Sequence, residues 1–284
     1  MSDAGRADAV PALSADDLRR LTDFLYDRTG MIFGESKRYF IQRRITQRMV
    51  ETGSDTFRNY FLRLAANPAE IEELINAFTI NETYFYREEH QLAALGNSIL
   101  PDLIGTRRPG DLIRIWSMPC ASGEEPYSIA IWLLENWRLV DAYNVEIIGS
   151  DIDTARLAQA EAGRYGERAL SRLPPDVVER YFERKRGQIR ELIDDIRESV
   201  HFQPVNLIDS AEMAAMGKFD VVFCRNLLIY FDGASRLIAA DHLFDCLNPS
   251  GYLCLGHTES MSRISDRFEL TRFDDAIVYR RRDG

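Results

Sequence analysis

The chain has 284 residues, of which 45% are hydrophobic and 28% are charged, and its formal net charge is −10. This composition is typical of a soluble globular protein and excludes a disordered or collagen-like chain. The acidic balance argues against a general nucleic-acid-binding protein, because such proteins carry an excess of basic residues. The length predicts one large domain or two modest ones.

The sequence shows no sign of membrane insertion or secretion. No stretch approaches the roughly 20 apolar residues that a transmembrane helix needs. Residues 1–10 include acidic side chains and no apolar core of a signal peptide. We therefore expect a cytoplasmic protein with a flexible N-terminus over residues 1–12. The cysteines lack the spacing of zinc ligands, so we expect reduced, mostly buried thiols and no metal.

Residues 13–80 show helical patterns and no strand pattern. Ser14 has the side chain of an N-cap, Asp16 and Asp17 follow in the first turn, and Gly30 ends this first helix. Further helices are predicted over about 36–51, 56–65 and 68–78. The sequence therefore predicts a small all-α domain over residues 13–80, followed by a linker and connecting helix over residues 81–110.

A basic segment lies within this helical domain. Residues 30–64 contain seven basic and three acidic side chains. At about 100° per residue, Lys37, Arg44 and Arg48 fall within a stripe about 40° wide, beside an apolar stripe. We expect the apolar stripe to pack and the basic stripe to face outward. An ordinary solvated face and a docking surface are both open readings of this pattern.

From about residue 111, short apolar runs alternate with helical stretches. The runs lie at 112–116, 145–148, 221–223 and 252–255, and the helices at 126–137, 154–162 and 234–247. This alternation predicts a parallel sheet with helices on both faces. Two further strands, 268–273 and 276–281, are close enough for a hairpin, which adds one antiparallel strand. The expected fold of residues 111–284 is a mixed, mostly parallel α/β sheet.

Residues 173–201 interrupt the alternation. A Pro-Pro pair opens a charged stretch in which residues 189–193 are the only strand-like run. We interpret the segment as an inserted surface subdomain. A solvated excursion and a docking surface are equally compatible with its composition.

Ligands of open α/β sheets bind beyond the carboxyl ends of the strands, so the residues after each strand are candidates for a site. Small residues and two carboxylates, Glu124 and Glu125, follow the first strand. These carboxylates would repel a pyrophosphate and suit a cationic or hydroxyl-rich ligand, or they only complement the dipole of the next helix. The segment contains neither a GxGxxG fingerprint nor a P-loop.

Polar residues also follow two other strands. Asp151 and Asp153 come after the second strand, where an acid often holds a ribose hydroxyl. One Asp would serve equally well as the N-cap of the next helix, so we assign Asp151 to a ligand and Asp153 to the cap. Arg225 and Asn226 directly follow the fourth strand. All of these side chains are expected to meet at one edge of the sheet.

Four motifs, in this order and spacing, resemble those of the chemotaxis receptor methyltransferases, the CheR family. They are NETYFYRE at 81–88, CASGEEPYS at 120–128, SDID at 150–153 and CRNLLIYF at 224–231. GHTES at 256–260 matches a further stretch. The resemblance covers the chain from about residue 13 to residue 279.

The resemblance implies a small helical domain followed by a Rossmann-like class I methyltransferase domain that uses S-adenosylmethionine (SAM). It implies methylation of glutamate side chains on the cytoplasmic helical domains of chemoreceptors, giving γ-methyl esters. It also implies catalytic roles for Arg87 and Tyr230, the latter near the transferred methyl group. The implied cofactor contacts are Asn81, Thr83, Arg87, Glu125, Asp151, Asn206, Leu207, Arg225 and Asn226.

This chemistry needs no strong base, because a glutamate carboxylate with a pKa near ~4.3 is already ionised at neutral pH. We therefore interpret His257 as structural. A basic stripe of Lys37, Arg44 and Arg48 would attract an acidic receptor helix. Family members that dock a receptor C-terminal pentapeptide use a β-subdomain at the place of residues 181–201. That segment looks shorter here, so we expect no such tether.

Other functions remain open from the sequence. The fold does not name the substrate, so another protein or a small molecule could accept the methyl group. A catalytically silent cofactor-binding protein is a second alternative, although residues of all four motifs are retained. A nucleotide-dependent oxidoreductase is disfavoured by the missing glycine fingerprint.

Overall fold

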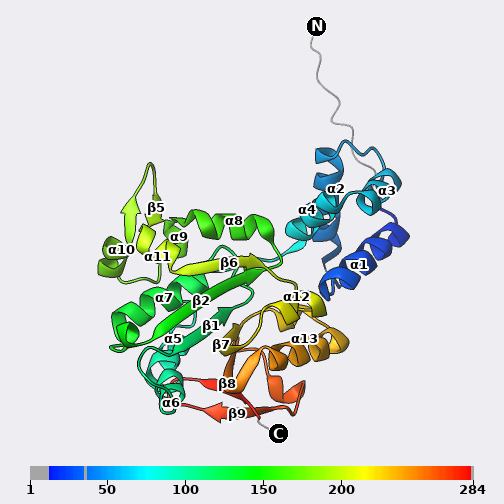
Figure 1. Ribbon diagram of the computed structural model, residues 1–284. Coiled ribbons are helices and arrows are strands. Elements are labelled where there is room, and N and C mark those ends of the chain that lie inside the picture. The colour runs from blue at the N-terminus through cyan, green and yellow to red at the C-terminus, as the bar shows by residue number, and fades with distance from the viewer. Residues whose placement is uncertain (1–12, 35–36, 283–284) are drawn as a thin grey trace. The chain divides into compact units, whose positions relative to one another are not determined.

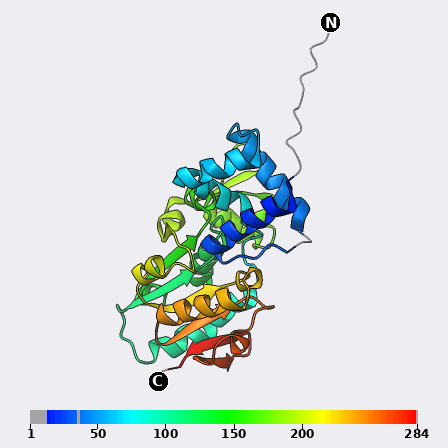
Figure 2. The same ribbon diagram turned by 90° about the vertical axis from the view of Figure 1, so that its right-hand side faces the viewer.

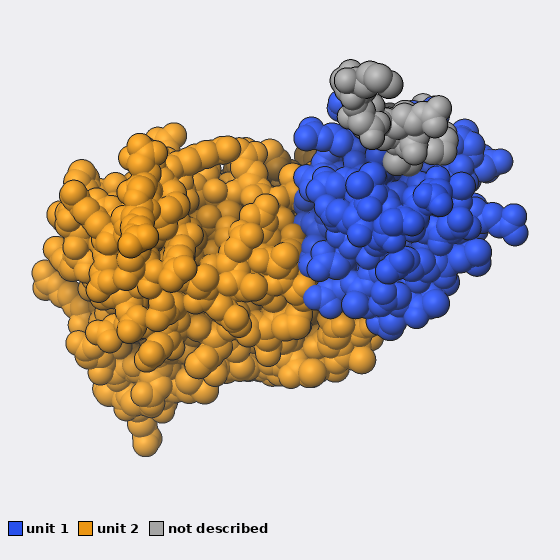
Figure 3. All heavy atoms as spheres, turned by 90° about the horizontal axis from the view of Figure 1, so that it is seen from above, with its two compact units in different colours: residues 1–79 blue, residues 80–284 orange. Residues whose placement is uncertain are grey.

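The computed structural model describes residues 13–34 and 37–282. The chain forms two compact units, residues 1–79 and residues 80–284 (Figure 3). The predicted flexible N-terminus, residues 1–12, lies outside the described residues. Among the residues that are described, no helix is both long and apolar enough to cross a membrane.

The described part of the first unit consists of helices packed around one core. They are α1 (Ala15–Thr29), α2 (Arg38–Glu51), α3 (Phe57–Ala66) and α4 (Pro68–Phe78). Ser14 and Asp17 cap the start of α1 reciprocally, and Gly30 ends the helix at a φ of 68°. The predicted start of the second helix at Ser36 falls outside the described residues. Each helix contributes one apolar face to a common core that includes Leu25, Ile45, Leu64 and Leu74.

The predicted outward position of Arg48 is wrong. Its side chain is only 13% exposed, and its Nη2 and Nε atoms lie 2.6 and 3.1 Å from the two carboxylate oxygens of Glu70 on α4. The Tyr60 hydroxyl donates to the same carboxylate at 2.7 Å. Burial raises the pKa of Tyr60, and Glu70 raises it further. Arg48 therefore joins α2 to α4, and its charge is already compensated inside the unit.

The second unit is built on a seven-stranded mixed sheet, which confirms the predicted fold class (Figure 1). Its order is β6-β2-β1-β7-β8-β10-β9, and the pairs from β6 to β8 are parallel. In this sheet β10 runs antiparallel to both β8 and β9, as the hairpin predicts. The strands are β1 (Leu112–Ser117), β2 (Asn144–Asp151), β6 (Val200–Pro204), β7 (Phe219–Cys224), β8 (Leu247–Leu255), β9 (Phe268–Arg272) and β10 (Ile277–Arg281).

Helices cover both faces of this sheet. Figures 1 and 2 show α5 and α7 on one face and α12 and α13 on the other. The helices are α5 (Glu89–Ala94), η2 (Leu95–Ile99), α6 (Leu100–Ile104), α7 (Glu124–Asn136), η3 (Val140–Ala142), α8 (Thr154–Ala162), α12 (Ser210–Ala215), η4 (Leu228–Tyr230), α13 (Gly233–Asp245) and η5 (Met261–Arg263). The central strands are therefore buried on both sides, which accounts for their unbroken apolar runs.

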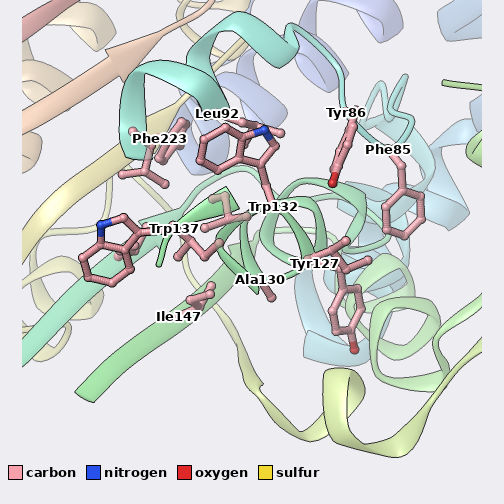
Figure 4. Packing of buried hydrophobic residues seen from close by; sticks show 14 of the residues in the cluster. Phe85, Tyr86, Leu92, Tyr127, Ala130, Trp132, Trp137, Ile147 and Phe223 are labelled. Carbon is pink, nitrogen blue, oxygen red and sulfur yellow. The ribbon is translucent and has the colours of Figure 1, made fainter. Parts of the chain in front are cut away.

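Large aromatic side chains fill the core between α5, α7 and the sheet (Figure 4). The Trp132 ring lies against η2 so closely that a Cβ added at Gly96 would come within 2.8 Å of two ring carbons. Tyr127 packs on the side of the core nearer Phe85. These contacts hold the first turn of α7 in a fixed position relative to the strands, and the candidate site begins at that turn.

A second, three-stranded antiparallel sheet carries the insertion. Its order is β3-β5-β4, formed by β3 (Arg164–Gly166), β4 (Phe182–Arg184) and β5 (Ile189–Leu192). Short helices flank it, namely α9 (Glu167–Leu170), α10 (Pro175–Tyr181) and α11 (Asp194–Glu198). The prediction of a single strand in this region is wrong, because strands of three residues are too short to show an alternating pattern. The expected absence of a tether therefore rests only on the shorter length of residues 181–201.

Candidate functional site

A cavity of about 230 Å³ opens beyond the carboxyl ends of β1, β2 and β7. It brings together eight of the ten residues predicted for cofactor binding or catalysis. Its lining consists of Ile80, Asn81, Glu82, Thr83, Arg87, Pro119, Ala121, Glu125, Asp151, Arg225, Asn226, Ile229 and Tyr230. The two predicted residues outside this lining are Asn206 and Leu207.

Asn206 and Leu207 follow β6, at the same edge of the sheet as the cavity. The Asn206 amide N–H donates to Glu212 at 2.7 Å. Leu207 is buried, and its carbonyl oxygen lies 2.7 Å from Nδ1 of His242. A cofactor could therefore contact these two residues only if part of it extends beyond this cavity.

The loop after β1 turns back tightly toward β2. Its Cys120 N–H donates to the Ser150 carbonyl at 2.8 Å. Ala121 and Gly123 adopt φ values of 45° and 89°, and Gly123 then starts α7. A Cβ at Gly123 would come within 2.8 Å of the Ala160 side chain, so this turn needs glycine for space as well as for conformation. Pro119 and Ala121 of this loop line the cavity and form one wall of the site.

Asp151 ends β2 and is buried beneath that loop. Its two carboxylate oxygens accept the N–H groups of Ala121 at 2.8 Å and Asp153 at 2.9 Å. Burial raises the pKa of Asp151 to about 6, although these hydrogen bonds act in the opposite direction. Asp153 accepts the Arg156 N–H at 3.0 Å and caps α8, as predicted. Asp151 lines the cavity and Asp153 does not, so Asp151 is the carboxylate of this pair that a ligand in the cavity could reach.

Arg225 lies at the centre of a buried ion network. Its guanidinium nitrogens lie 2.5 Å from Glu125 and 3.1 Å from Glu88, and one of them donates to the Arg87 carbonyl at 2.9 Å. Burial acts to lower the pKa of Arg225, but the two carboxylates outweigh it and raise that pKa. On the far side, His257 Nδ1 lies 3.0 Å from Glu88. The network fixes Glu125 at the cavity wall.

The loop after β7 is held by Glu259. Its carboxylate accepts backbone N–H groups from Asn226 at 2.7 Å, Leu228 at 2.7 Å and Gly256 at 2.8 Å. Asn226 adopts a φ of 60°, a conformation that asparagine tolerates better than most residues. Burial raises the pKa of Glu259, and the hydrogen bonds to its carboxylate oppose that effect. Glu259 thus shapes the cavity wall without lining the cavity.

Arg87 and Tyr230 both line the cavity, although they lie far apart in the sequence. Arg87 donates to the Glu82 carbonyl and lies 6.0 Å from the centre of the Tyr84 ring. Tyr230 lies on η4 and is half-buried. Burial raises the pKa of Tyr230, while Arg87 acts to lower it. The Tyr230 hydroxyl is therefore protonated at neutral pH and can donate a hydrogen bond.

Sequence reasoning assigned no role to two of the residues that organise the site. Glu88 and Glu259 each lie within a motif, at 81–88 and 256–260, yet neither contacts the cavity. A sequence feature that could have identified them is an acidic residue near a turn at the end of a strand. At such a turn, unpaired backbone N–H groups or an arginine need an acceptor. His257 is 67% exposed and contacts Glu88 rather than the cavity, in agreement with a structural role.

Comparison with known proteins identifies the family of this chain. Residues 16–79 match the "CheR methyltransferase, all-alpha domain", and residues 81–277 match the "CheR methyltransferase, SAM binding domain". The chain belongs to the CheR methyltransferase family. It is 48% identical to chemotaxis protein methyltransferase 2 of Vibrio cholerae, over 93% of this chain and 92% of that protein.

Two other relatives match this chain over a similar share of its length. The chemotaxis protein methyltransferase of Salmonella typhimurium is 35% identical over 91% of this chain and 88% of its own. Chemotaxis protein methyltransferase 1 of Pseudomonas aeruginosa is 33% identical over 90% and 94%. This CheR chain is thus a methyltransferase with a helical domain and a SAM-binding domain, and the cavity lies in the latter.

The cavity residues fit the chemistry of SAM. This cofactor carries a cationic sulfur, ribose hydroxyls and an amino-acid group with both charges. The CheR cavity offers carboxylates at Glu125 and Asp151, a guanidinium at Arg87 and an amide at Asn226. Within the described ranges, no group of three or more His, Cys, Asp or Glu side chains could hold a metal ion.

Proposed function

We propose that this protein transfers a methyl group from SAM to glutamate side chains in the cytoplasmic helical domains of chemoreceptors. The product would be a γ-methyl ester, and the enzyme would act in the cytoplasm without a metal ion. Supporting this proposal, the curated relatives are named chemotaxis protein methyltransferases. The observation that carries it is the convergence of Arg87, Asp151, Arg225 and Tyr230 on one cavity of a SAM-binding domain.

We assign the cofactor contacts by the chemistry of each side chain. Asp151, at the end of the second strand, is placed to accept hydrogen bonds from ribose hydroxyls. Glu125, held by Arg225, suits the ammonium group or the cationic sulfur. Asn81, Thr83 and Asn226 offer further hydrogen-bonding groups along the lining. Asn206 and Leu207 would serve a part of the cofactor that extends past this cavity.

Bound SAM supplies an activated methyl group, so the protein needs only to align it with the acceptor. A glutamate carboxylate, with a pKa near ~4.3, is already ionised at neutral pH. In this proposal the Arg87 guanidinium attracts that carboxylate, and the Tyr230 hydroxyl donates a hydrogen bond to one oxygen so that the other faces the methyl group. One C–O bond forms while the bond from sulfur to the methyl group breaks. Orientation of this kind can lower a barrier by about 7–11 kcal/mol.

In this proposal the receptor contacts basic side chains at the start of α2 and along it. Lys37 and Arg44 keep this proposed role, whereas Arg48 is engaged with Glu70 and does not. Arg44 is half-buried, with its guanidinium 5.0 Å from the Phe40 ring. Cations on an otherwise acidic protein would steer an acidic helix toward the enzyme. The absence of a pentapeptide tether stays a prediction, which rests on the shorter length of residues 181–201.

Transfer of labelled methyl groups from SAM to purified chemoreceptor cytoplasmic fragments tests the proposal. We expect label on the fragment that mild alkali releases, as it does from a carboxyl ester. Label that resists alkali would move the methyl group to another acceptor atom. Binding of S-adenosylhomocysteine (SAH) without any transfer would instead favour a catalytically silent protein.

A further inference from the structure

A second concave surface adjoins the cofactor cavity. This groove has a volume of about 390 Å³ and lies between η4, the start of α13 and residues 258–264. Its lining consists of Leu228, Ile229, Gly233, Arg236, Leu237, Thr258, Glu259, Ser260, Arg263 and Ile264. Ile229 lines both the groove and the cavity, and Tyr230 follows it directly. An occupant of the groove would therefore lie beside the proposed point of methyl transfer.

The groove combines an apolar surface with two cations. Leu237 is 55% exposed and Ile229 is 43% exposed, and both line the same groove, so they present a joint apolar surface. Arg236 uses its Nε to donate to the Leu228 carbonyl at 2.9 Å, and its terminal nitrogens remain available. Among the described residues, no hydrogen bond or ion pair engages the Arg263 side chain, which is exposed.

The groove offers a ligand no unoccupied carboxylate. Glu259 is the one carboxylate in its lining, and that carboxylate is occupied by three backbone N–H groups. Two arginines against this one carboxylate make the lining net positive, although residues 81–284 carry 24 basic and 33 acidic side chains. An acidic ligand with an apolar face is the chemistry that this surface complements.

We infer that the groove binds the substrate segment next to the accepting glutamate, as an acidic amphipathic helix. The apolar face of such a helix would cover Ile229 and Leu237, in the manner of helix-in-groove recognition. Its carboxylates would pair with Arg236 and Arg263. This inference rests on the proposed function and adds to it a second, specificity-determining contact, on the SAM-binding domain itself.

Kinetics of the full-length protein on a receptor cytoplasmic fragment test the charge contact. The variant R263E reverses an exposed charge, and R138E, in the exposed segment after α7, is the matched control. We expect R263E to raise KM for the fragment by about fivefold, with kcat and SAH affinity unchanged. The difference should shrink at high salt, because exposed charges are screened. R138E should leave all of these values at the wild-type level.

Crosslinking tests the location independently. All four native cysteines are buried, so the variant L237C carries one exposed thiol. L139C, at a leucine of similar exposure near R138, is its control. We expect a thiol-directed photocrosslinker at position 237 to capture the receptor fragment, and the same reagent at position 139 to capture none.

The outcomes separate this inference from the proposed function. If wild-type protein methylates the fragment, while R263E and R138E share one KM or position 237 crosslinks no better than 139, the inference is wrong and the function stands. If wild-type protein methylates no receptor fragment, the proposed function is wrong and the inference falls with it.

Discussion

Replacing Asp151 with asparagine should remove a pH-dependent destabilisation of the fold while weakening cofactor binding. Asp151 is buried at the end of β2, and burial raises its pKa from the ordinary 3.8 to about 6. The ionised carboxylate therefore costs the folded state about 3 kcal/mol at pH 7.5. Asparagine keeps the size of the side chain and carries no charge, but it has one oxygen acceptor for the two N–H groups that Asp151 holds, so it also loses a hydrogen bond at every pH.

The effect of this replacement has a defined pH dependence. Because the folded-state pKa is raised, the folded protein holds a proton that the unfolded chain releases between pH 3.8 and about 6. The wild type therefore loses stability as pH rises through this window. The stability of D151N relative to wild type should be highest above pH 6, and should fall by about 1.4 kcal/mol between pH 7.5 and pH 5.

Urea unfolding followed by circular dichroism measures this difference at each pH, and calorimetry with SAH measures the loss of affinity. D141N is the matched control, because Asp141 is exposed and lies on η3. A stability difference between D151N and wild type that stays constant across this pH range would refute the electrostatic reasoning. Undiminished SAH affinity in D151N would refute the assignment of Asp151 to the cofactor.

Four further predictions follow from the structure. Glu70→Ala should lower the unfolding free energy of the helical unit by about 1–3 kcal/mol, since it removes the buried acceptor that Arg48 and Tyr60 share while Arg48 keeps its contact with Glu51; thermal unfolding measures this. Gly256→Ala would place a Cβ 2.6 Å from Asn226 Nδ2, so it should cost about 1–3 kcal/mol of stability and weaken SAH binding measured by calorimetry. Arg44→Glu should slow receptor methylation in the labelled-methyl assay without changing SAH affinity, and equal turnover would contradict its role. Titration with a receptor C-terminal pentapeptide should show no tight binding, and low-micromolar affinity would overturn that expectation.

The sequence predicted which side chains gather at the cavity where those side chains stand at the ends of strands. Asp151 ends β2 and Arg225 directly follows β7, and residues at the ends of parallel strands must meet at one edge of the sheet. The cap formed by Asp153 was predictable for a similar reason, because an exposed helix start needs an acceptor within two or three residues. These positions depend on local sequence and on a topology that the β–α alternation already implies.

The sequence could not predict contacts that depend on packing between elements. Arg48 has the position of a surface residue on α2, but a helical wheel does not show that Glu70 on α4 lies within reach. Strands β3 and β4 are three residues long and acquire their identity only by pairing with β5. The link from His257 through Glu88 to Arg225 joins residues more than 130 positions apart, so no local pattern reveals it.

The central claim is that this protein esterifies glutamate side chains of a receptor. Peptide mapping by mass spectrometry, after incubation of a chemoreceptor cytoplasmic fragment with enzyme and SAM, tests that claim most directly. The account predicts the added mass of one methyl group on specific glutamate residues, lost on mild alkaline treatment and absent when those residues are replaced by alanine. Methyl groups found on lysine, arginine or a chain terminus, and stable to alkali, would contradict it.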